Sequence, residues 1–266
     1  MPTALDRIID YKRDEVAALK LRHSMASLRA DAEAAAPPRG FAQRLGDVAN
    51  SGRNALICEL KRKSPSAGDI LPGADPVEIA REYEAGGAAC LSILTDYKSF
   101  GGSLGDMAAI RTAVNLPVLR KDFMIDEIQV AEARASGADA ILVILSALDD
   151  GLARALCEMA DDFGMDAIIE VHDADELERA NALPSPLVGI NNRDLKRMVT
   201  DLATTERLAS ALAPEKTLIS ESGISEVEHI ARLRRTGARR FLIGESLMKS
   251  QNRTAQCESL CNASED

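Results

Sequence analysis

LPVLRKDFMIDEIQVAEARASGADAILVI, residues 116–144, is the segment of this chain that says most about its architecture. It begins with one short apolar run and ends with another. Both runs are continuous rather than alternating, which is typical of strands buried on both faces of a parallel sheet. Between them, Ile128, Ala131 and Ala135 repeat at helical spacing, and Gly137 follows where glycine often ends a helix. The segment therefore predicts one strand–helix–strand unit.

The same unit repeats along the chain. Its helix-to-strand turn, SGAD at 136–139, returns as GGAA at 86–89 and as TGAR at 236–239. Eight short apolar runs separated by helix-length segments predict an α/β fold, a (β/α)8 TIM barrel. The doubly wound alternative usually carries G-x-G-x-x-G after its first strand, and KRKSPSAGD stands there instead. The expected strands are Ala55–Leu60, Cys90–Thr95, Leu116–Leu119, Ala140–Leu145, Asp166–Val171, Leu187–Ile190, Thr217–Ser220 and Arg240–Ile243.

The barrel pattern is preceded by an N-terminal helical extension, residues 1–50. Its segment LDRIIDYKRDEVAALK has the apolar spacing of an amphipathic helix. The pair Pro37-Pro38 interrupts the extension, and Phe41–Val48 predicts a second short helix. We expect the extension to be a lid or a plug for a barrel core at 51–250, not a second domain.

The end of the chain, 251–266, differs from a usual last barrel helix because it is polar. Thr254, Cys257, Leu260 and Cys261 form at most a narrow apolar stripe there. We therefore expect a short or loosely packed last helix, within one domain that spans 1–266.

Composition and charge exclude several classes of protein. The 266 residues are 46% hydrophobic and carry a net charge of −10. An acidic surface argues against nucleic acid or an anionic membrane as the partner. No apolar run reaches the roughly 18 residues that span a bilayer, and no signal-peptide core opens the chain. We expect a cytoplasmic protein.

Cysteine and histidine do not form the common metal-binding patterns. The 5 cysteines include no CxxC pair, and the 3 histidines do not stand beside them. The chain also lacks the G-x-S-x-G elbow of a serine nucleophile. We therefore expect reduced, buried thiols and no metal site.

Polar side chains end several of the predicted strands. Because alternate side chains of a strand point the same way, Glu59 and Lys61 share a face with Ile57, and Lys121 shares one with Leu119. The carboxyl ends of the strands carry the active site in a TIM barrel. Buried charges are costly to a fold unless they are paired, but they suit proton transfer. The strand-end candidates are Glu59, Lys61, Lys121, Phe123, Glu170, Asn191, Arg193, Glu221 and Ser222.

Two glycines indicate a phosphate site. Gly223 and Gly244 follow the last two strands, whose loops often bind phosphate in this kind of barrel. Glycine lets backbone N–H groups approach an anion closely. Since Glu245 would repel a phosphate, we expect its side chain to face away and Ser246 or backbone amides to make the contact.

Six segments, in order along the chain, carry a family resemblance: CELKRKSPSAGDI, LPVLRKDFMIDEIQVAEARASGADAILVI, IIEVHDADELERA, VGINNRDL, LISESGI and FLIGESLM. They resemble the segments of the indole-3-glycerol phosphate synthase family, over about residues 1–250. The resemblance implies a carboxy-lyase of tryptophan biosynthesis that acts on 1-(2-carboxyphenylamino)-1-deoxyribulose 5-phosphate. Such an enzyme closes a pyrrole ring with loss of carbon dioxide and water. The resemblance implies no metal and no organic cofactor.

The resemblance also implies a role for each matching position. Lys121 is similar to the general acid that protonates the substrate carbonyl, for which we expect a depressed pKa. Glu170 is similar to its acid–base partner, Glu59 to the base in dehydration, and Lys61 to the lysine that binds the substrate carboxylate. Phe123 is expected in the slot for the anthranilate ring. The other matching contacts to substrate and phosphate are Ser64, Asn191, Arg193, Glu221, Ser222, Gly223 and Gly244.

Three other functions stay open from the residues alone. A Schiff-base lyase would use Lys121 as a nucleophile, and a non-catalytic barrel would only bind a phosphorylated ligand. An isomerase of the neighbouring step would need an Asp/Cys pair, for which Cys58 lies on the wrong face of its strand. The expected partner is a small phosphorylated substrate, with the protein a monomer or weak homodimer. Which glutamate acts at which step stays open too.

Overall fold

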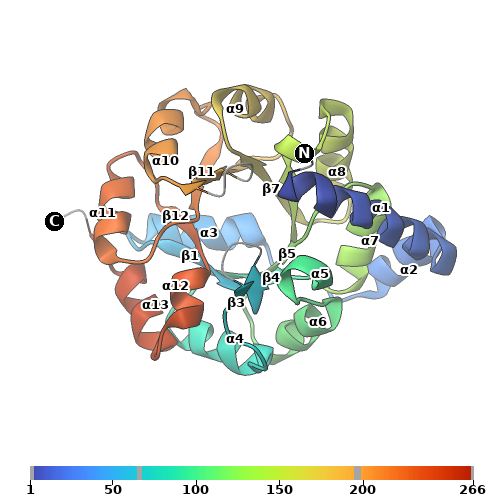
Figure 1. Ribbon diagram of the computed structural model, residues 1–266, viewed down its shortest axis with the longest axis horizontal. Helices are drawn as coiled ribbons and strands as arrows, with labels where there is room; N and C mark the ends of the chain where they lie inside the picture. Colours follow the sequence, from blue (N-terminus) through green and yellow to red (C-terminus); the bar gives the residue numbers. More distant parts are fainter. Residues whose placement is uncertain (1–2, 65–67, 195–198, 265–266) are drawn as a thin grey trace.

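Eight parallel strands close into a barrel in the computed structural model, which describes residues 3–64, 68–194 and 199–264 (Figure 1). Around the barrel the strands follow the order β1-β12-β11-β8-β7-β6-β5-β4, and β4 pairs with β1 to close it. The predicted (β/α)8 TIM barrel is confirmed. Residues 65–67 of the CELKRKSPSAGDI segment lie outside the described residues. The barrel strands are β1 (Ala55–Leu60), β4 (Cys90–Leu94), β5 (Val118–Lys121), β6 (Ala140–Ile144), β7 (Asp166–Val171), β8 (Leu187–Asn191), β11 (Thr217–Glu221) and β12 (Arg240–Ile243).

The strand bounds differ from the predicted ones by at most two residues. The largest shift is in β5, which begins at Val118 because Pro117 has no N–H to donate to a neighbouring strand. It reaches Lys121, whose carbonyl accepts the N–H of Thr95 at 3.1 Å. Two hairpins lie in the loops after β1 and β8: β2 (Lys63–Ser64) with β3 (Gly68–Asp69), and β9 (Arg193–Asp194) with β10 (Val199–Thr200).

Helices surround the strands and bury the outer faces of the barrel (Figure 1). Cys58 and Leu60 of β1 belong to this outer core, whereas Ile57 points inward to the residues that fill the barrel. The alternation predicted for β1 is therefore confirmed. The helices after β1 are α4 (Pro76–Ala85), α5 (Tyr97–Phe100), α6 (Leu104–Ala113), α7 (Glu127–Ala135), η1 (Leu145–Ala147), α8 (Asp150–Asp162), α9 (Ala174–Asn181), α10 (Ala203–Leu208), η2 (Ala209–Ala211), α11 (Val227–Arg234), α12 (Glu245–Lys249) and α13 (Arg253–Cys261).

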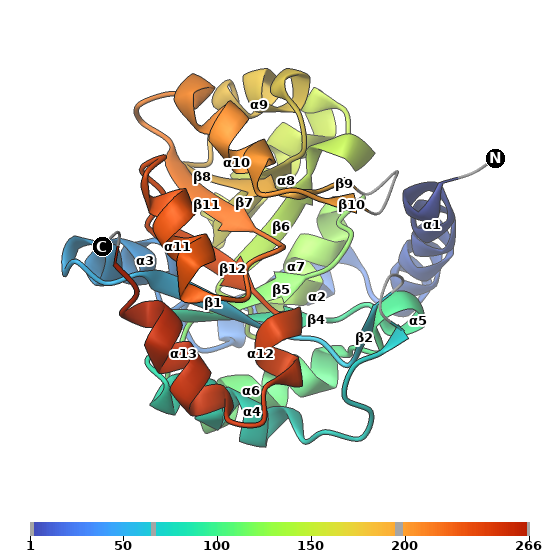
Figure 2. The ribbon, with the colours of Figure 1, turned by 60° about the vertical axis from the view of Figure 1, so that its left-hand side comes forward.

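The N-terminal extension forms three helices, which lie at different parts of the barrel: α1 (Ala4–Arg22), α2 (Met25–Ala34) and α3 (Phe41–Asn50). Phe41 and Leu45 of α3 are fully buried and pack on the inner core at the amino end of the strands. Helix α1 lies at the opposite side of the molecule, near α5 and the hairpins (Figure 2). One helix thus plugs the barrel, while another lies beside its mouth. The sequence did not predict α2, which Ser24 caps by accepting the N–H of Ser27.

The last helix was expected to be short or loosely packed; α13 is short, at 9 residues, but it is closely packed. Cys257, Leu260 and Cys261 are at most 1% exposed. They fit because Gly86 of the loop after α4 leaves space for Cys257; a Cβ there would lie 2.7 Å from the Cys257 Cβ. Since helices from both ends of the chain pack on the barrel, we propose that 1–266 is one domain. In the described ranges, every helix is too short or too polar to cross a membrane.

Candidate active site

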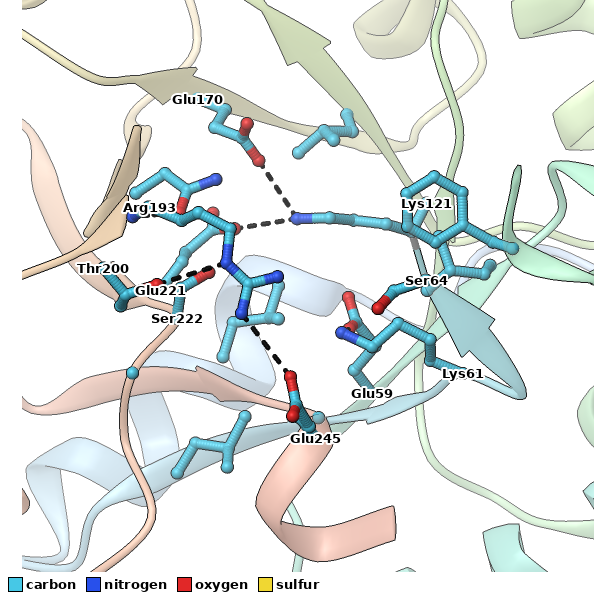
Figure 3. A pocket seen from close by; sticks show the side chains of 18 of the residues that line it. Glu59, Lys61, Ser64, Lys121, Glu170, Arg193, Thr200, Glu221, Ser222 and Glu245 are labelled. Atoms are coloured by element: carbon cyan, nitrogen blue, oxygen red, sulfur yellow. Dashed lines mark hydrogen bonds and ion pairs between the residues drawn. The ribbon is translucent and has the colours of Figure 1, made fainter. Parts of the chain in front are cut away.

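The carboxyl ends of the barrel strands surround a pocket of about 430 Å³, shown in Figure 3. Every candidate residue taken from the sequence lies in its wall. The charged groups come from the ends of different strands, and the closed barrel brings them together. The predicted residues in the wall are Glu59, Lys61, Ser64, Lys121, Phe123, Glu170, Asn191, Arg193, Glu221, Ser222, Gly223, Gly244 and Ser246.

Lys121 lies between two carboxylates at the centre of the pocket (Figure 3). Its Nζ donates to Glu221 Oε2 at 2.7 Å and to Glu170 Oε2 at 3.1 Å. Both glutamates are at most 2% exposed. The ammonium group therefore faces two acceptors in a site with little water to compete for them.

The pKa of Lys121 is raised, so the expectation of a depressed pKa was wrong. Burial alone would lower it, but the carboxylates of Glu221, Glu170 and Glu59 outweigh burial. Burial, together with the neighbouring Glu170 carboxylate, raises the pKa of Glu221 to about 7 against the opposing effect of Lys121. Burial would also raise the pKa of Glu170, but Lys121 and His172 hold it below its usual range. Near neutral pH the site thus offers a cationic donor, an ionised carboxylate and a carboxyl group that readily exchanges a proton.

Two glycines make room for two of the carboxylates. A Cβ on Gly189 of β8 would lie 2.0 Å from Glu221 Oε1, and one on Gly244 would lie 2.5 Å from Glu59 Oε1. Gly244 has a negative φ of −126°, so this close approach, rather than backbone strain, explains why it is glycine.

Replacing Gly189 with alanine is expected to lower kcat at least about tenfold and to cost about 1–3 kcal/mol of stability. The added methyl group displaces Glu221 and therefore the Lys121 amine that it holds. Steady-state kinetics and thermal unfolding measure the two effects. Gly46→Ala in α3 is the matched control, because a Cβ there meets no atom within 4 Å. Unchanged kcat in Gly189→Ala would contradict the tight placement of Glu221.

A second ion pair lies at the end of β1. Lys61 Nζ is 2.8 Å from Glu59 Oε1, and both side chains are about nine-tenths buried. Burial would raise the pKa of Glu59, but Lys61 and Lys121 outweigh it and hold that pKa below its usual range. Glu59 is therefore ionised and can accept a proton, with a cation beside it.

Ser222 has a strained backbone at the pocket wall. Its φ of 68° is the one positive value found at a non-glycine residue in 3–64, 68–194 and 199–264, a conformation that costs roughly 1 kcal/mol or more. Buried Asn192 holds this turn, because its Nδ2 donates to the Ser222 carbonyl at 3.1 Å and its Oδ1 accepts from Thr205. Gly223 follows with φ of 80°. The strained turn lies where we expected substrate and phosphate contacts.

Glu245 does not face away from the pocket, so that prediction was wrong. Its side chain lies in the pocket wall and points toward Arg193 (Figure 3). Its Oε2 is 3.5 Å from Arg193 Nη2, and its Oε1 accepts from Lys249 Nζ at 2.7 Å. The two cations compensate its charge. Ser246 also lines the pocket, but its hydroxyl donates to the Ile224 carbonyl at 2.9 Å.

One side of the pocket is apolar. Phe123 packs against Phe100, with ring centroids 6.2 Å apart, and both line the cavity. Leu5 and Ile8 of α1 add further apolar side chains to the lining of the pocket. The sequence predicted Phe123 but not the other three, because α5 and α1 are brought to the mouth only by the tertiary fold.

A buried lysine fastens α1 to the barrel. Lys12 is 3% exposed, and its Nζ lies 2.7 Å from Asp122 Oδ1 and 3.0 Å from Asp96 Oδ2. Glu15 of the same helix adds a third carboxylate at 2.8 Å. Asp122 follows Lys121 directly in sequence. The helix that supplies Leu5 and Ile8 is thus tied to the strand end that carries Lys121, a contact that no sequence pattern indicated.

Comparisons with known proteins show the family of the chain. The family model described as indole-3-glycerol phosphate synthase matches residues 5–260. The chain belongs to the indole-3-glycerol phosphate synthase family. It is 64% identical to the indole-3-glycerol phosphate synthase of Hyphomonas neptunium, over 96% of this chain and 97% of that one. It is 52% identical to that of Rhodospirillum rubrum, over 94% of this chain and 95% of the relative.

A solved structure of lower identity shares the fold of this family member. The crystal structure of 3-hexulose-6-phosphate synthase superposes with a TM-score of 0.65, covering 79% of this chain and 99% of that one. At 17% identity, this likeness supports the barrel alone. The family assignment rests on the family model and the close relatives. In the ranges that the structure describes, we find no cluster of three or more His, Cys, Asp or Glu placed to hold a metal ion.

Proposed function

We propose that this chain is an indole-3-glycerol phosphate synthase. It converts 1-(2-carboxyphenylamino)-1-deoxyribulose 5-phosphate to indole-3-glycerol phosphate in tryptophan biosynthesis, with loss of carbon dioxide and water. The family membership supports the reaction. The observation that carries the proposal in the structure is Lys121, held as a cation between two buried carboxylates beside an apolar wall.

The pocket has a place for each part of this substrate. The anthranilate ring lies against Phe123, and its carboxylate pairs with Lys61. The phosphate binds at the opposite side, where the N–H groups near Gly223, Gly244 and Ser246 can receive it, with Ser64 and Ser222 as further contacts. This orientation places the substrate carbonyl near Lys121 at the centre of the pocket.

Ring closure needs a proton at the carbonyl oxygen as the ring carbon attacks. Lys121 donates that proton as a general acid, and Glu170, the ionised carboxylate beside its Nζ, is its acid–base partner. Asn191 and Glu221 hold the substrate hydroxyl, and Arg193 orders the strand-end groups. Loss of carbon dioxide then restores the aromatic ring. In the dehydration Glu59 takes the proton from carbon as the base, and the leaving hydroxyl takes a proton from the Lys61 ammonium beside it and departs as water.

The structure favours this mechanism over the alternatives. An amine that attacks a carbonyl carbon must be uncharged, but the carboxylates beside Lys121 raise its pKa and keep it protonated. The Asp/Cys isomerase needs a thiol in the pocket, and Cys58 belongs to the outer core of the barrel. A barrel that only binds ligand gives no reason to gather five charged strand-end groups in one cavity.

We also propose a cell compartment, a partner and an oligomeric state for the enzyme. We place it in the cytoplasm, where its five free, buried thiols stay reduced. Its partner is the small phosphorylated substrate rather than nucleic acid, in keeping with the net charge of −10. The working form is a monomer or a weak homodimer, and the reaction as drawn uses no cofactor.

Turnover of the proposed substrate tests the function directly. The chain has no Trp, so the indole product is followed by fluorescence over a low protein background. Purified protein is expected to give a rising indole signal. A folded protein that gives no signal at any substrate concentration refutes the proposal, and borohydride trapping of a Lys121 adduct would then support the Schiff-base lyase.

Replacing Ser222 with alanine is expected to raise KM roughly tenfold and to change kcat less, because a hydroxyl that binds the charged phosphate contributes to ground-state binding. Steady-state kinetics separates the two constants. Ser99→Ala in α5, whose hydroxyl contacts Tyr11 outside the pocket, is the control. An unchanged KM would remove Ser222 from the binding site.

A further inference from the structure

His172 lies next to the active site but not in it. It follows Glu170 by two residues on the strand end of β7. Among the described residues that line the pocket, Glu170 is present and His172 is absent. Its side chain is 12% exposed. A group in this position contacts the catalytic carboxylate from behind, away from the substrate.

Both ring nitrogens of His172 face carboxylates. Nδ1 lies 3.0 Å from Glu176 Oε2, and the same oxygen accepts the backbone N–H of His172 at 2.8 Å. Nε2 lies 3.3 Å from Glu170 Oε1. This second contact is not aligned as a straight hydrogen bond, so it is an ion pair. Glu170 is thus held from two sides, by Lys121 on Oε2 and by His172 on Oε1.

The surroundings of His172 keep the ring charged. Burial alone would lower its pKa, but the carboxylates of Glu170 and Glu176 outweigh burial and raise it to about 10. Glu176 is itself fixed, because it stands in the first turn of α9, where Asp173 accepts its backbone N–H at 2.9 Å. The three side chains form an acid–imidazolium–acid chain that runs from α9 to the pocket.

The carboxylate of Glu170 needs such a second contact to hold one orientation. The terminal torsion of a glutamate side chain has a broad energy profile. Lys121 on Oε2 and the side chain of Asn191 also contact this carboxylate, but neither places a cation on Oε1. A cation on the other oxygen restricts that rotation and favours the ionised form.

We propose that His172, held by Glu176, is a positioning residue for Glu170: its cationic ring fixes Oε1, so that Oε2 faces Lys121 and the substrate. This inference rests on the proposed function, because it assigns Glu170 a part in that reaction. A merely structural role would be different, since His172 would then only join β7 to α9 through Glu176.

Two amide variants separate these roles. The amide of glutamine reaches about as far as Nε2 of histidine, so His172→Gln keeps an N–H donor toward Glu170. The amide of asparagine reaches only as far as Nδ1, so His172→Asn keeps the contact with Glu176 and leaves Glu170 Oε1 without its partner. We expect His172→Asn to lower kcat about tenfold with KM changed by less than about twofold, and His172→Gln to stay within about threefold of the parent.

The ranking of the two variants decides the result. Equal kcat in both, or a loss in His172→Asn that appears only as a lower Tm or a higher KM, overturns the proposal. Glu176→Gln is expected to lower kcat by about threefold, because a neutral amide holds the His172 ring less firmly than the Glu176 carboxylate does. Glu178→Gln, an exposed carboxylate of the same helix, is the matched control and should leave kcat unchanged.

A measurement without substrate keeps this inference separate from the proposed function. With 3 histidines in the chain, the ring nitrogen signals of His172 can be assigned by nitrogen-15 NMR. His172 is expected to remain an imidazolium to about pH 9 and to titrate lower in Glu176→Gln. A titration of parent His172 near its ordinary value of about 6.5 overturns the acid–imidazolium–acid chain. Parent protein that shows this chain but gives no indole instead contradicts the proposed function.

Discussion

Replacing Lys121 with alanine is expected to lower kcat by about 10³-fold while the barrel stays folded. The change removes the proton donor and leaves Glu170 and Glu221 without their shared cation. The fold survives because the pKa of Glu221 is already about 7, so this carboxyl group takes up a proton instead of remaining a buried, unpaired charge. Indole fluorescence gives the rate, and circular dichroism reports the fold.

Lys20→Ala is the matched control for this experiment. Lys20 is a half-exposed lysine of α1 that pairs with Asp126 outside the pocket, so its loss should leave kcat within about twofold. Turnover of Lys121→Ala close to the parent rate would refute the general-acid role. If Lys121→Ala is unfolded, that result would instead refute the expectation that Glu221 becomes protonated, and so uncharged, when Lys121 is removed.

Replacing Lys12 with methionine is expected to cost about 3–5 kcal/mol of stability. Methionine fills similar space, so the cost comes mainly from Asp96 and Asp122, which lose a cation while 0% and 3% exposed. Because α1 also supplies Leu5 and Ile8 to the pocket wall, KM should rise. Urea unfolding measures the stability. Arg13→Met, one residue further and 68% exposed at its side chain, should change it by less than about 0.5 kcal/mol.

The effect of Lys12→Met should depend on pH in a defined direction. Burial would raise the pKa of Asp122, but Arg120 and Lys12 outweigh it and hold that pKa below its ordinary value of 3.8. The stabilisation is therefore present above that value and is lost as pH falls through the lower, folded-state pKa. The stability difference between parent and Lys12→Met should narrow below about pH 4. A difference that is equal at pH 7 and pH 3 would show that packing, not charge, fastens α1.

Periodicity predicted the barrel and the place of several candidate residues at its mouth, because both follow from local rules. Buried parallel strands leave continuous apolar runs, and β1 shows how a strand of known direction fixes which side chains face inward. Glu59 and Lys61 could be assigned to the mouth from that alternation alone. Their roles came from the family resemblance, since alternation says where a side chain points but not what it does.

The features that the sequence did not predict all depend on contacts between distant segments. From the sequence, Lys12 is only a polar residue on an amphipathic helix. The packed fold shows that its ammonium group pairs with Asp96 and Asp122. Glu245 was expected to avoid the pocket because the sequence does not show that Arg193 and Lys249 compensate it. The pKa of Lys121 was misjudged although the glutamates were expected at the same barrel mouth. The sequence does not give the close contacts of Glu221 and Glu170 with its Nζ, through which the carboxylates outweigh burial. The polar-looking α13 packs well because Gly86 makes room for Cys257.

The most direct test of this account is mass spectrometry of the product formed by the purified protein from 1-(2-carboxyphenylamino)-1-deoxyribulose 5-phosphate. We expect a product that has lost one carbon dioxide and one water, formed at a rate that falls with Lys121→Ala. A product that retains the carboxyl group, or a rate that is the same with and without Lys121, would contradict it.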